Sequence, residues 1–469
     1  MATKTKPATI GELRATGYRV LPVREEMRQN LVRMLRDGDE LFPGIVGYED
    51  TVIPQVENAI LSGQDIVLLG ERGQAKTRIA RSLVALLDEE TPVIAGCEIN
   101  DNPLDPICKS CQLLLAEEGD ETPITWLPRD RRYGEKLATP DITIADLVGE
   151  VDPIKVAEGR YLSDELTIHY GLIPRTHRGI FCINELPDLA ERIQVGLLNI
   201  LEERDVQIRG YKVRLPLDVF VVASANPEDY TNRGRIITPL KDRLGSEIRT
   251  HYPRDVEHEI TIMVAEAAPV EIEGIETVYP EFMKQIVAEL THLARSSAEI
   301  SQKSGVSVRV SITNYENVMS NAVRRALRLK ERQAVPRVSD LSAVIASTAG
   351  KIELDTVGEV REEKVVDKLV RQAINKVFRQ YFDPAEFGQL VAGFEKGMAV
   401  QASEQQPSME YVNQLARVGG LKPAIAKLKG HGSPAMLASA IEFILEGLHL
   451  NKRLNKDEME GRVRYRPRD

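Results

Sequence analysis

The sequence predicts an α/β fold, in which helices cover both faces of a parallel sheet, followed by a helical second half. Short apolar runs such as Ile66–Leu69 and Val219–Ser224 are typical of strands that are buried on both faces. These runs alternate with amphipathic helical segments up to about residue 254, which is the pattern of a parallel sheet. Beyond that point the strand pattern fades and helical periodicity continues.

The composition is that of an ordinary globular protein. Of the 469 residues, 42% are hydrophobic and 28% are charged, so the chain can form a large core. The formal net charge of −10 argues against general nucleic-acid binding. The sequence shows no apolar run of membrane-spanning length, no signal peptide and only four cysteines. We therefore expect a cytoplasmic protein with reduced cysteines and no membrane span.

The chain is organised around residues 65–77, Asp-Ile-Val-Leu-Leu-Gly-Glu-Arg-Gly-Gln-Ala-Lys-Thr. An apolar strand ends in a small-residue loop, and helical spacing follows over Arg78–Leu87. This order is typical of a phosphate-binding loop, whose backbone N–H groups and helix N-terminus cradle a triphosphate. Lys76 is expected to reach the β- and γ-phosphates, and Thr77 to hold Mg²⁺. The residues expected to bind the nucleotide here are Gly70, Glu71, Arg72, Gly73, Gln74, Ala75, Lys76 and Thr77.

Ala75 stands where the usual pattern, G-x-x-x-x-G-K-[ST], has its second glycine. Alanine costs little there if its φ is negative, because only a positive φ strongly favours glycine. The alternative, a chance lysine after a strand, is disfavoured by the motifs downstream.

A second apolar strand, Gly179–Ile183, ends in the polar pair Asn184-Glu185. A nucleotide hydrolase normally has Asp-Glu here, where the first residue holds hydrated Mg²⁺ and the second polarises the attacking water. Glu185 fits the second role. Asn184 can accept a hydrogen bond from metal-bound water but brings no charge, so weaker Mg²⁺ affinity or slower turnover is a hypothesis. The alternative is that the pair only caps the following turn.

Three further polar residues complete the candidate site. Asn226 ends the next buried strand, at the sheet edge where ligands of α/β proteins bind, and can orient the attacking water; an Asn-Pro turn is the alternative. Arg243 is a candidate for reaching the nucleotide of a neighbouring subunit, and Arg309 for touching the phosphates in its own subunit. Taken singly, each arginine is more simply a solvated surface charge.

The order of these motifs resembles the AAA+ ATPases, and most closely the clade of magnesium chelatase I subunits and MoxR-type proteins. The resemblance runs from about Phe42 to about Ala349, and Asn184 departs from the family pattern. It rests on Ala75 before the loop lysine, Gly149–Gly159 as the helix-2 insert, Val206–Leu215 as the pre-sensor hairpin, Ser224–Glu228 as sensor 1, Leu240–Leu244 as the arginine-finger segment and Ser307–Arg309 as sensor 2.

The resemblance implies a P-loop NTPase of the AAA+ type that uses ATP and Mg²⁺. It also implies a ring, usually a hexamer, that remodels a partner protein or promotes metal insertion, often with a separate von Willebrand A domain protein. We expect an N-terminal helical arm (1–40), an AAA+ α/β domain (41–254), a helical lid (255–350) and a C-terminal helical extension (351–469).

Two other functions remain open. Enhancer-binding transcription activators share the core, but they carry a Gly-Ala-Phe-Thr-Gly-Ala loop that is missing between Lys76 and Glu185. A nucleotide-gated scaffold with slow turnover is the second alternative, and the uncharged Asn184 makes it more plausible.

Three cysteines form a separate candidate site. Cys108-x-x-Cys111 has the spacing of zinc ligands, and Cys97 lies nearby in the sequence. A fourth ligand is missing locally, because Cys182 belongs to the hydrolysis strand and no histidine is near. A zinc site is therefore one hypothesis, and reduced free thiols are the favoured alternative.

Overall fold

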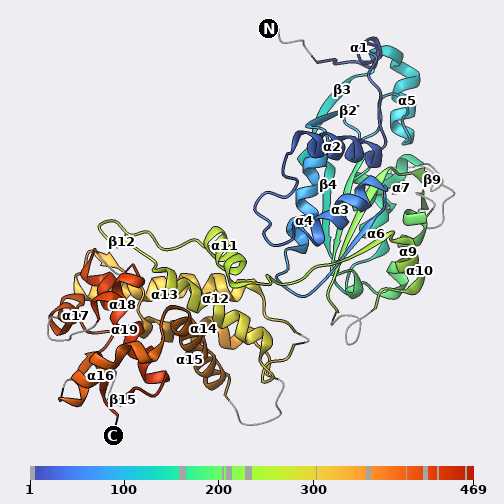
Figure 1. The fold of residues 1–469 in the computed structure, drawn as a ribbon. Helices are drawn as coiled ribbons and strands as arrows, with labels where there is room; N and C mark the ends of the chain where they lie inside the picture. The colour runs from blue at the N-terminus through green and yellow to red at the C-terminus, as the bar shows by residue number, and fades with distance from the viewer. Residues whose placement is uncertain are drawn as a thin grey trace. The chain divides into compact units, whose positions relative to one another are not determined.

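The chain forms two compact units, residues 1–251 and 252–469 (Figure 1). Hydrophobic clusters form within each unit. The computed structural model describes residues 6–157, 165–202, 205–207, 214–227, 235–302, 304–354, 361–397, 399–415, 421–429, 432–459 and 462–468.

The first unit is built on the predicted parallel sheet, which has five strands in the order β11-β1-β10-β7-β4. Its strands are β1 (Ile66–Leu69), β4 (Tyr133–Leu137), β7 (Gly179–Asn184), β10 (Val219–Ala225) and β11 (Ser246–Arg249). In the register, Leu69 lies beside Ala225, and Ile183 lies beside Ala223. The carboxyl ends of β1, β7 and β10 therefore meet at one edge of the sheet.

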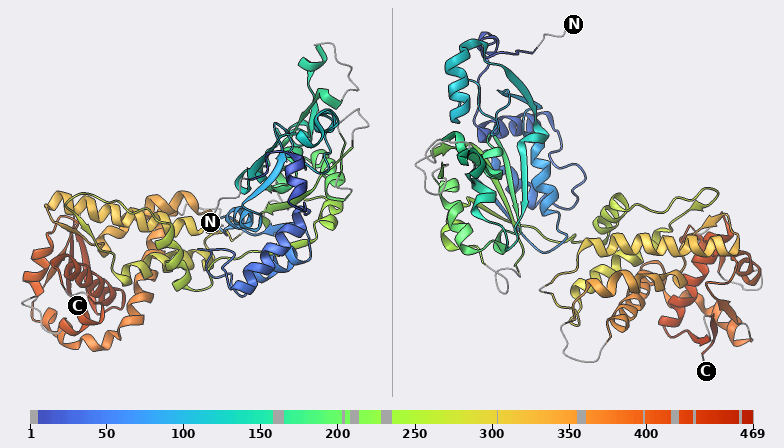
Figure 2. Two further views of the ribbon diagram at one scale, coloured as in Figure 1. Left: turned by 90° about the horizontal axis from the view of Figure 1, so that it is seen from above. Right: turned by 180° about the vertical axis from the view of Figure 1, so that it is seen from behind.

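Helices cover both faces of this sheet, as the sequence predicts (Figure 2). One face packs against α2 (Val23–Asp37), α3 (Val52–Leu61) and α4 (Lys76–Ser82). The other packs against α6 (Ile144–Val148), α8 (Leu172–Arg175), α9 (Glu191–Glu202) and α10 (Thr238–Arg243). Successive residues of each inner strand belong alternately to the hydrophobic cores on the two faces of the sheet. This explains why these strands are apolar throughout.

A buried ion pair attaches α2 to the rest of the first unit. The Arg132 guanidinium donates to the two carboxylate oxygens of Glu26 at 2.7 and 2.6 Å, and both side chains are almost fully buried. Glu26 also accepts a hydrogen bond from the backbone N–H of Asp88. Helix α2 is thus held by this ion pair as well as by its apolar face.

The first unit also contains smaller helices and strand pairs outside the five-stranded sheet. β2 (Glu90–Ile94) and β3 (Ile124–Pro128) form an antiparallel pair beside α1 (Ile10–Ala15) and α5 (Lys109–Glu118). The segment predicted as the helix-2 insert, Gly149–Gly159, includes β5 (Gly149–Val151) and α7 (Pro153–Ala157), and β5 pairs antiparallel with β6 (Ile168–Tyr170). β8 (Asp205–Gln207) and β9 (Arg214–Pro216) pair antiparallel, as a hairpin over Val206–Leu215 requires, and its pre-sensor role stays a prediction. Residues 208–213, 158–159 of the predicted insert and 228 of the sensor 1 segment lie outside the described ranges.

The second unit is mainly helical, as predicted. Its helices are α11 (Val256–Glu266), α12 (Glu281–Ser296), α13 (Val308–Leu329), α14 (Val344–Thr348), α15 (Glu362–Tyr381), α16 (Gly388–Glu395), α17 (Ser408–Leu415), α18 (Lys422–Lys427) and α19 (Pro434–Leu450). Two small sheets accompany them: β12 (Glu276–Thr277) with β13 (Gln333–Ala334), and β14 (Val400–Ala402) with β16 (Arg462–Pro467) and β15 (Leu454–Met459).

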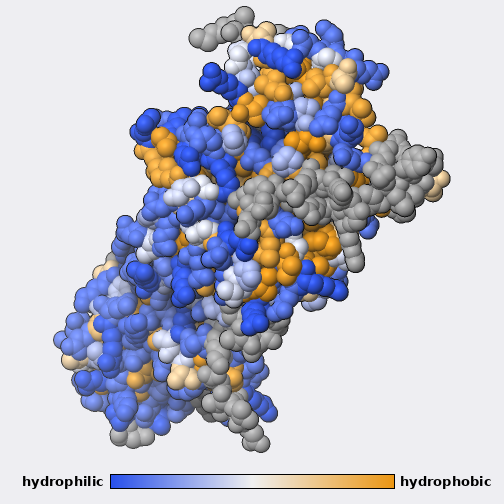
Figure 3. Space-filling view, turned by 90° about the vertical axis from the view of Figure 1, so that its right-hand side faces the viewer, coloured by the Kyte–Doolittle hydropathy of each residue, from blue (hydrophilic) through white to orange (hydrophobic). Residues whose placement is uncertain are grey.

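The faces of the two units that are visible in Figure 3 differ. Figure 3 shows apolar side chains gathered on the visible face of the first unit, whereas that of the second unit is mainly hydrophilic. Large apolar side chains exposed on the first unit include Leu113, Leu137, Ile154 and Val195. None of the helices in the described ranges combines the length and apolar content that crossing a bilayer requires.

Candidate functional site

The phosphate-binding loop leaves β1 at Gly70 and enters α4 at Lys76. A Cβ on Gly70 would lie 1.9 Å from the Thr250 hydroxyl and 2.3 Å from Oε1 of Gln74, so only glycine fits. Oε1 of Gln74 accepts hydrogen bonds from the Glu71 N–H at 3.0 Å and from the Thr250 hydroxyl at 2.8 Å. The loop is therefore shaped by close contact with the strand end at Thr250.

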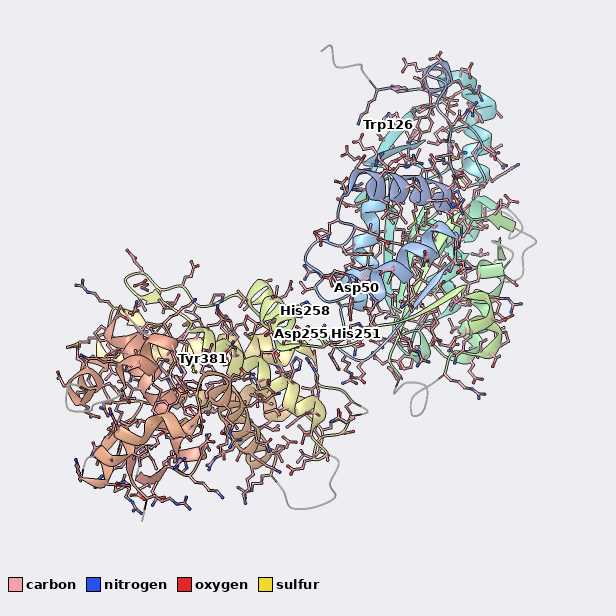
Figure 4. The ribbon with its side chains drawn as sticks, in the orientation of Figure 1. Asp50, Trp126, His251, Asp255, His258 and Tyr381 are labelled. Carbon is pink, nitrogen blue, oxygen red and sulfur yellow. The ribbon has the colours of Figure 1, made fainter. Side chains whose placement is uncertain are left out.

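A buried tyrosine supports the loop from the other side. The Tyr48 hydroxyl lies 3.0 Å from the carbonyl oxygen of Gln74 and 2.7 Å from that of His251, which is labelled in Figure 4. Burial raises the pKa of Tyr48 to about 12, so the hydroxyl keeps its proton at neutral pH and remains a donor.

Ala75 adopts a left-handed conformation, with φ 56° and ψ 13°. The condition under which alanine would cost little here, a negative φ, is therefore not met. A side chain in this region costs about 1–2 kcal/mol, and such strain persists where the surrounding structure holds it. Gly73 also has a positive φ, so the loop has the backbone curvature that the usual second glycine provides.

Lys76 connects the loop to the neighbouring strand. Lys76 is only 7% exposed, and its ammonium donates to the carbonyl oxygens of Gly70 and Glu71. It also donates to Oδ1 of Asn226 at 2.8 Å. Thr77 follows on the first turn of α4 and is partly buried. Arg72, at the loop tip, is exposed.

Asn226 also reaches Glu185. Its amide donates to Oε2 of Glu185 at 2.5 Å, while the backbone N–H of Glu185 donates to the Ser224 hydroxyl. Glu185 has φ 56° and ψ 47° where β7 turns into the next segment. The structure thus joins Lys76, Asn226 and Glu185, which the sequence places at the ends of three strands, into one chain of contacts.

Asn184 lies beside a carboxylate that sequence reasoning missed. Its amide donates to Oε1 of Glu135 at 2.6 Å, and its Oδ1 accepts from the Ser224 hydroxyl at 3.2 Å. These contacts tie Asn184 to neighbouring strands rather than to the following turn. Glu135 also forms a two-pronged ion pair with Arg81 at 2.8 and 3.0 Å, and this hydrogen bonding lowers the pKa of the Glu135 carboxyl.

The two candidate arginines lie away from these contacts in sequence and remain predictions. Arg243 ends α10, is partly exposed, and donates to the carbonyl of Pro239 at 2.9 Å. Arg309 is exposed in the first turn of α13 in the second unit, where its backbone N–H donates to the Ser307 hydroxyl.

The three candidate zinc cysteines come together, and Asp101 joins them. The ligand atoms of Cys97, Asp101, Cys108 and Cys111 all lie within 4.8 Å of one another. Hydrogen bonds from the thiols of Cys108 and Cys111 lower the pKa of Cys97 to about 4, and burial raises the pKa of Asp101 to about 7. Asp101 offers a fourth potential ligand atom, which the sequence analysis found missing; only its position four residues after Cys97 hinted at it.

Comparison with known proteins finds relatives that match about half to two thirds of the chain. The family model of the Sigma-54 interaction domain matches residues 158–246. A magnesium-chelatase 38 kDa subunit of Rhodobacter capsulatus is 27% identical over 226 residues, covering 47% of this chain and 59% of the relative. The 38 kDa subunit of Cereibacter sphaeroides is 29% identical over 228 residues, covering 47% and 62%. The ChlI subunit of Nephroselmis olivacea is 25% identical over 328 residues, covering 65% and 86%.

Solved structures give weaker matches. A structure of the complex between the BchI and BchD subunits of magnesium chelatase aligns with a TM-score of 0.35 and 19% identity, covering 69% of this chain and 98% of that one. NtrX from Brucella abortus aligns with a TM-score of 0.38 and 16% identity, covering 82% and 72%.

The chain spans about three fifths of the length of the two bacterial relatives. The sequence matches and the observed loop, sheet and helical unit agree with the resemblance found in the motifs. The chain is similar to subunits of magnesium chelatase over part of its length, and residues 158–246 match the Sigma-54 interaction domain.

Proposed function

We propose that this protein binds ATP with Mg²⁺ and hydrolyses the terminal phosphate at the carboxyl edge of the central sheet. The observation that carries the proposal is the contact chain from Lys76 through Asn226 to Glu185. The Lys76 ammonium, our candidate for phosphate binding, contacts the amide oxygen of Asn226, and the carboxylate of Glu185, our candidate base, contacts its amide nitrogen. The named relatives, all magnesium-chelatase subunits, support the same activity.

The residues present fit a nucleotide and its metal ion. The Lys76 ammonium is held by carbonyl and amide oxygens, and a phosphate attracts it more strongly because the phosphate carries negative charge. Gly70 leaves no Cβ at the mouth of the loop. The Thr77 hydroxyl and Asn184 are the residues that would hold Mg²⁺ and its water, and the ion would neutralise charge on the phosphates.

Asn226 positions the base. Its Nδ2 donates to Glu185 Oε2 while its Oδ1 accepts from Lys76. When Lys76 turns to a phosphate, Oδ1 becomes available to the attacking water. The Glu185 carboxylate, oriented by the same amide, then accepts a proton from that water.

The test is steady-state ATP hydrolysis by the native protein and by Lys76→Ala. Removing the ammonium should lower turnover by at least about 100-fold, as expected for loss of a charged group at developing phosphate charge. Lys422→Ala, an exposed lysine on α18, is the matched control and should hydrolyse ATP like the native protein. Native turnover no higher than that of Lys76→Ala would support the scaffold alternative and reject the motor.

The uncharged Asn184 can be tested by exchanging its amide with the neighbouring carboxylate. The double variant Asn184→Asp, Glu135→Gln keeps one carboxylate and one amide in contact, whereas Asn184→Asp alone puts two carboxylates at a 2.6 Å contact. We expect the double variant to need about fivefold less Mg²⁺ for half-maximal turnover, since a hydrogen bond to a charged acceptor contributes roughly 1 kcal/mol more than one to a neutral acceptor. Glu135→Gln alone is the control, and an unchanged Mg²⁺ dependence would show that residue 184 does not act on the metal.

We extend the proposal to a ring, as a hexamer in the AAA+ family, in which Arg243 reaches the nucleotide of a neighbouring subunit and Arg309 acts within its own. The exposed apolar side chains of the first unit offer surface for subunit contact (Figure 3). The names of the relatives favour chelatase-like work, either metal insertion or remodelling of a separate partner such as a von Willebrand A domain protein. The resemblance to MoxR-type proteins, the cytoplasmic location and the division into four domains stay predictions.

The enhancer-binding activator remains the second candidate because the Sigma-54 interaction model matches residues 158–246. The missing Gly-Ala-Phe-Thr-Gly-Ala sequence between Lys76 and Glu185 counts against it. The curated relatives favour the chelatase-like function.

A further inference from the structure

The segment between β2 and α5 brings four metal-binding side chains to one point. The sulfur atoms of Cys97, Cys108 and Cys111 and a carboxylate oxygen of Asp101 lie within 4.8 Å of one another. Cys108 and Cys111 are buried, Cys97 is partly buried, and Asp101 is 0% exposed. None of the four cysteines of the chain forms a disulfide.

Backbone hydrogen bonds fix the direction of these ligands. Sγ of Cys97 accepts from the N–H groups of Ile99 and Asp101 at 3.4 and 3.3 Å. Sγ of Cys108, the N-cap of α5, accepts from the N–H of Cys111 at 3.4 Å. Such bonds orient metal ligands and disperse thiolate charge. The turn of Cys108-x-x-Cys111 is thus shaped to aim two sulfurs at one centre.

Asp101 is the observation that points to a cation. Its two carboxylate oxygens accept hydrogen bonds from the N–H groups of Ile107 and Cys108, both at 2.9 Å. No lysine, arginine or histidine in the described part of the chain forms an ion pair with it. A fully buried carboxylate is costly unless a charge or a metal compensates it. Each oxygen retains a lone pair, and three sulfur atoms lie within 4.8 Å of one of these oxygens.

Reduced free thiols explain the cysteines but not the carboxylate. A buried free cysteine acts as a small apolar side chain, and the two N–H bonds that Asp101 accepts leave its negative charge without a cation. A cation bound by all four side chains accounts for the burial, the convergence and the N–H···S bonds together. Soft thiolate ligands select zinc over magnesium or calcium.

We propose that Cys97, Asp101, Cys108 and Cys111 bind one structural Zn²⁺ ion. Three thiolates and one carboxylate oxygen complete a tetrahedral set, so no position is left open for substrate. The thiols release their protons to solvent on binding, and no electron transfer is involved. The ion would tie the end of β2 to the N-terminus of α5. This role is independent of nucleotide chemistry at the central sheet.

The first test is the metal content of the full chain. The protein is purified without chelator and analysed by inductively coupled plasma mass spectrometry. We expect about one zinc ion per chain, as for a closed four-ligand site. Cys108→Ser and Asp101→Asn should each lower the zinc content. Cys182→Ala, which removes the buried cysteine of β7 outside the cluster, is the matched control and should keep it.

The second test uses the native chain, so it does not depend on whether a variant folds. The zinc is removed under reducing conditions and Co²⁺ alone is added. We expect a sulfur-to-cobalt charge-transfer band and the visible bands of tetrahedral Co²⁺, with competition by Zn²⁺. Absence of bound zinc together with absence of these bands would overturn the site. A Co²⁺ spectrum that is unchanged in Asp101→Asn would overturn the assignment of Asp101 as the fourth ligand.

Discussion

Replacing Glu185 by glutamine is expected to lower ATP turnover by about 10²- to 10⁴-fold, the contribution of a positioned general base. Glutamine keeps the size of the side chain and an oxygen that can accept from the Asn226 amide, now at 2.5 Å from the carboxylate. It cannot take a proton from the attacking water. ATP binding should therefore persist, because Lys76 and the loop backbone are unchanged. Turnover and equilibrium nucleotide binding are the two measurements.

Glu191→Gln is the matched control for this prediction. Glu191 is exposed at the start of α9, where it lies 3.6 Å from Arg235, and its replacement should leave turnover unchanged. If Glu185→Gln hydrolyses ATP as fast as the native protein, Glu185 is not the base.

The same variant tests the proposed ring. A protein that binds ATP without hydrolysing it should accumulate in the ATP-bound assembly, which mass photometry detects as multiples of the 52.3 kDa chain. Affinity purification of that state should also retain the partner. A monomer at all nucleotide concentrations would reject the ring while leaving the assignment of Glu185 intact, because the kinetic result is independent.

Replacing Glu26 by glutamine is expected to destabilise the first unit by about 3–5 kcal/mol, the usual effect of breaking a buried ion pair. Arg132 is 1% exposed, so the variant leaves its positive charge buried without a carboxylate. The hydrogen bond from the Asp88 N–H to residue 26 can persist with glutamine. The loss of unfolding free energy therefore comes mainly from breaking the ion pair. The free energy of unfolding in urea is the quantity to measure.

The chain provides both a probe and a control for this experiment. Trp126 is the single tryptophan and lies on β3 in the first unit (Figure 4), so its fluorescence follows that unit. Glu25→Gln changes the neighbouring residue on α2, whose ion pair with Arg28 is partly exposed. Exposed pairs contribute about 0–1 kcal/mol. Equal effects of the two variants would contradict the assigned role of the buried pair.

Sequence alone determined the α/β class, the inner strands and the loop. These features have local signals, because a strand buried on both faces must be apolar throughout and a phosphate-binding loop needs small residues before Lys76-Thr77. Parallel pairing then predicts that strand ends meet at one edge. Glu185 and Asn226 at their strand ends were therefore candidates for the same nucleotide site as Lys76.

The edge strands escaped prediction because water relaxes the apolar requirement at a sheet edge. β4 and β11 contain charged residues and occupy the two ends of the sheet. The charged C-terminal segment, which pairs as β15 and β16, also lacks a continuous apolar run in the sequence. Glu135 was not predicted as a site residue because it lies on β4, and only the pairing of β4 with β7 brings it beside Asn184.

Tertiary structure also decided two points of detail. The φ of Ala75 depends on how the loop must bend between β1 and α4, which the residue type does not reveal. Asp101 became the fourth member of the cysteine cluster only through the fold of the segment after β2. Sequence specifies which residues can bind a phosphate or a metal, because that is a property of side-chain chemistry. Which of them meet is decided by chain packing, because packing brings together groups that have no fixed spacing in sequence.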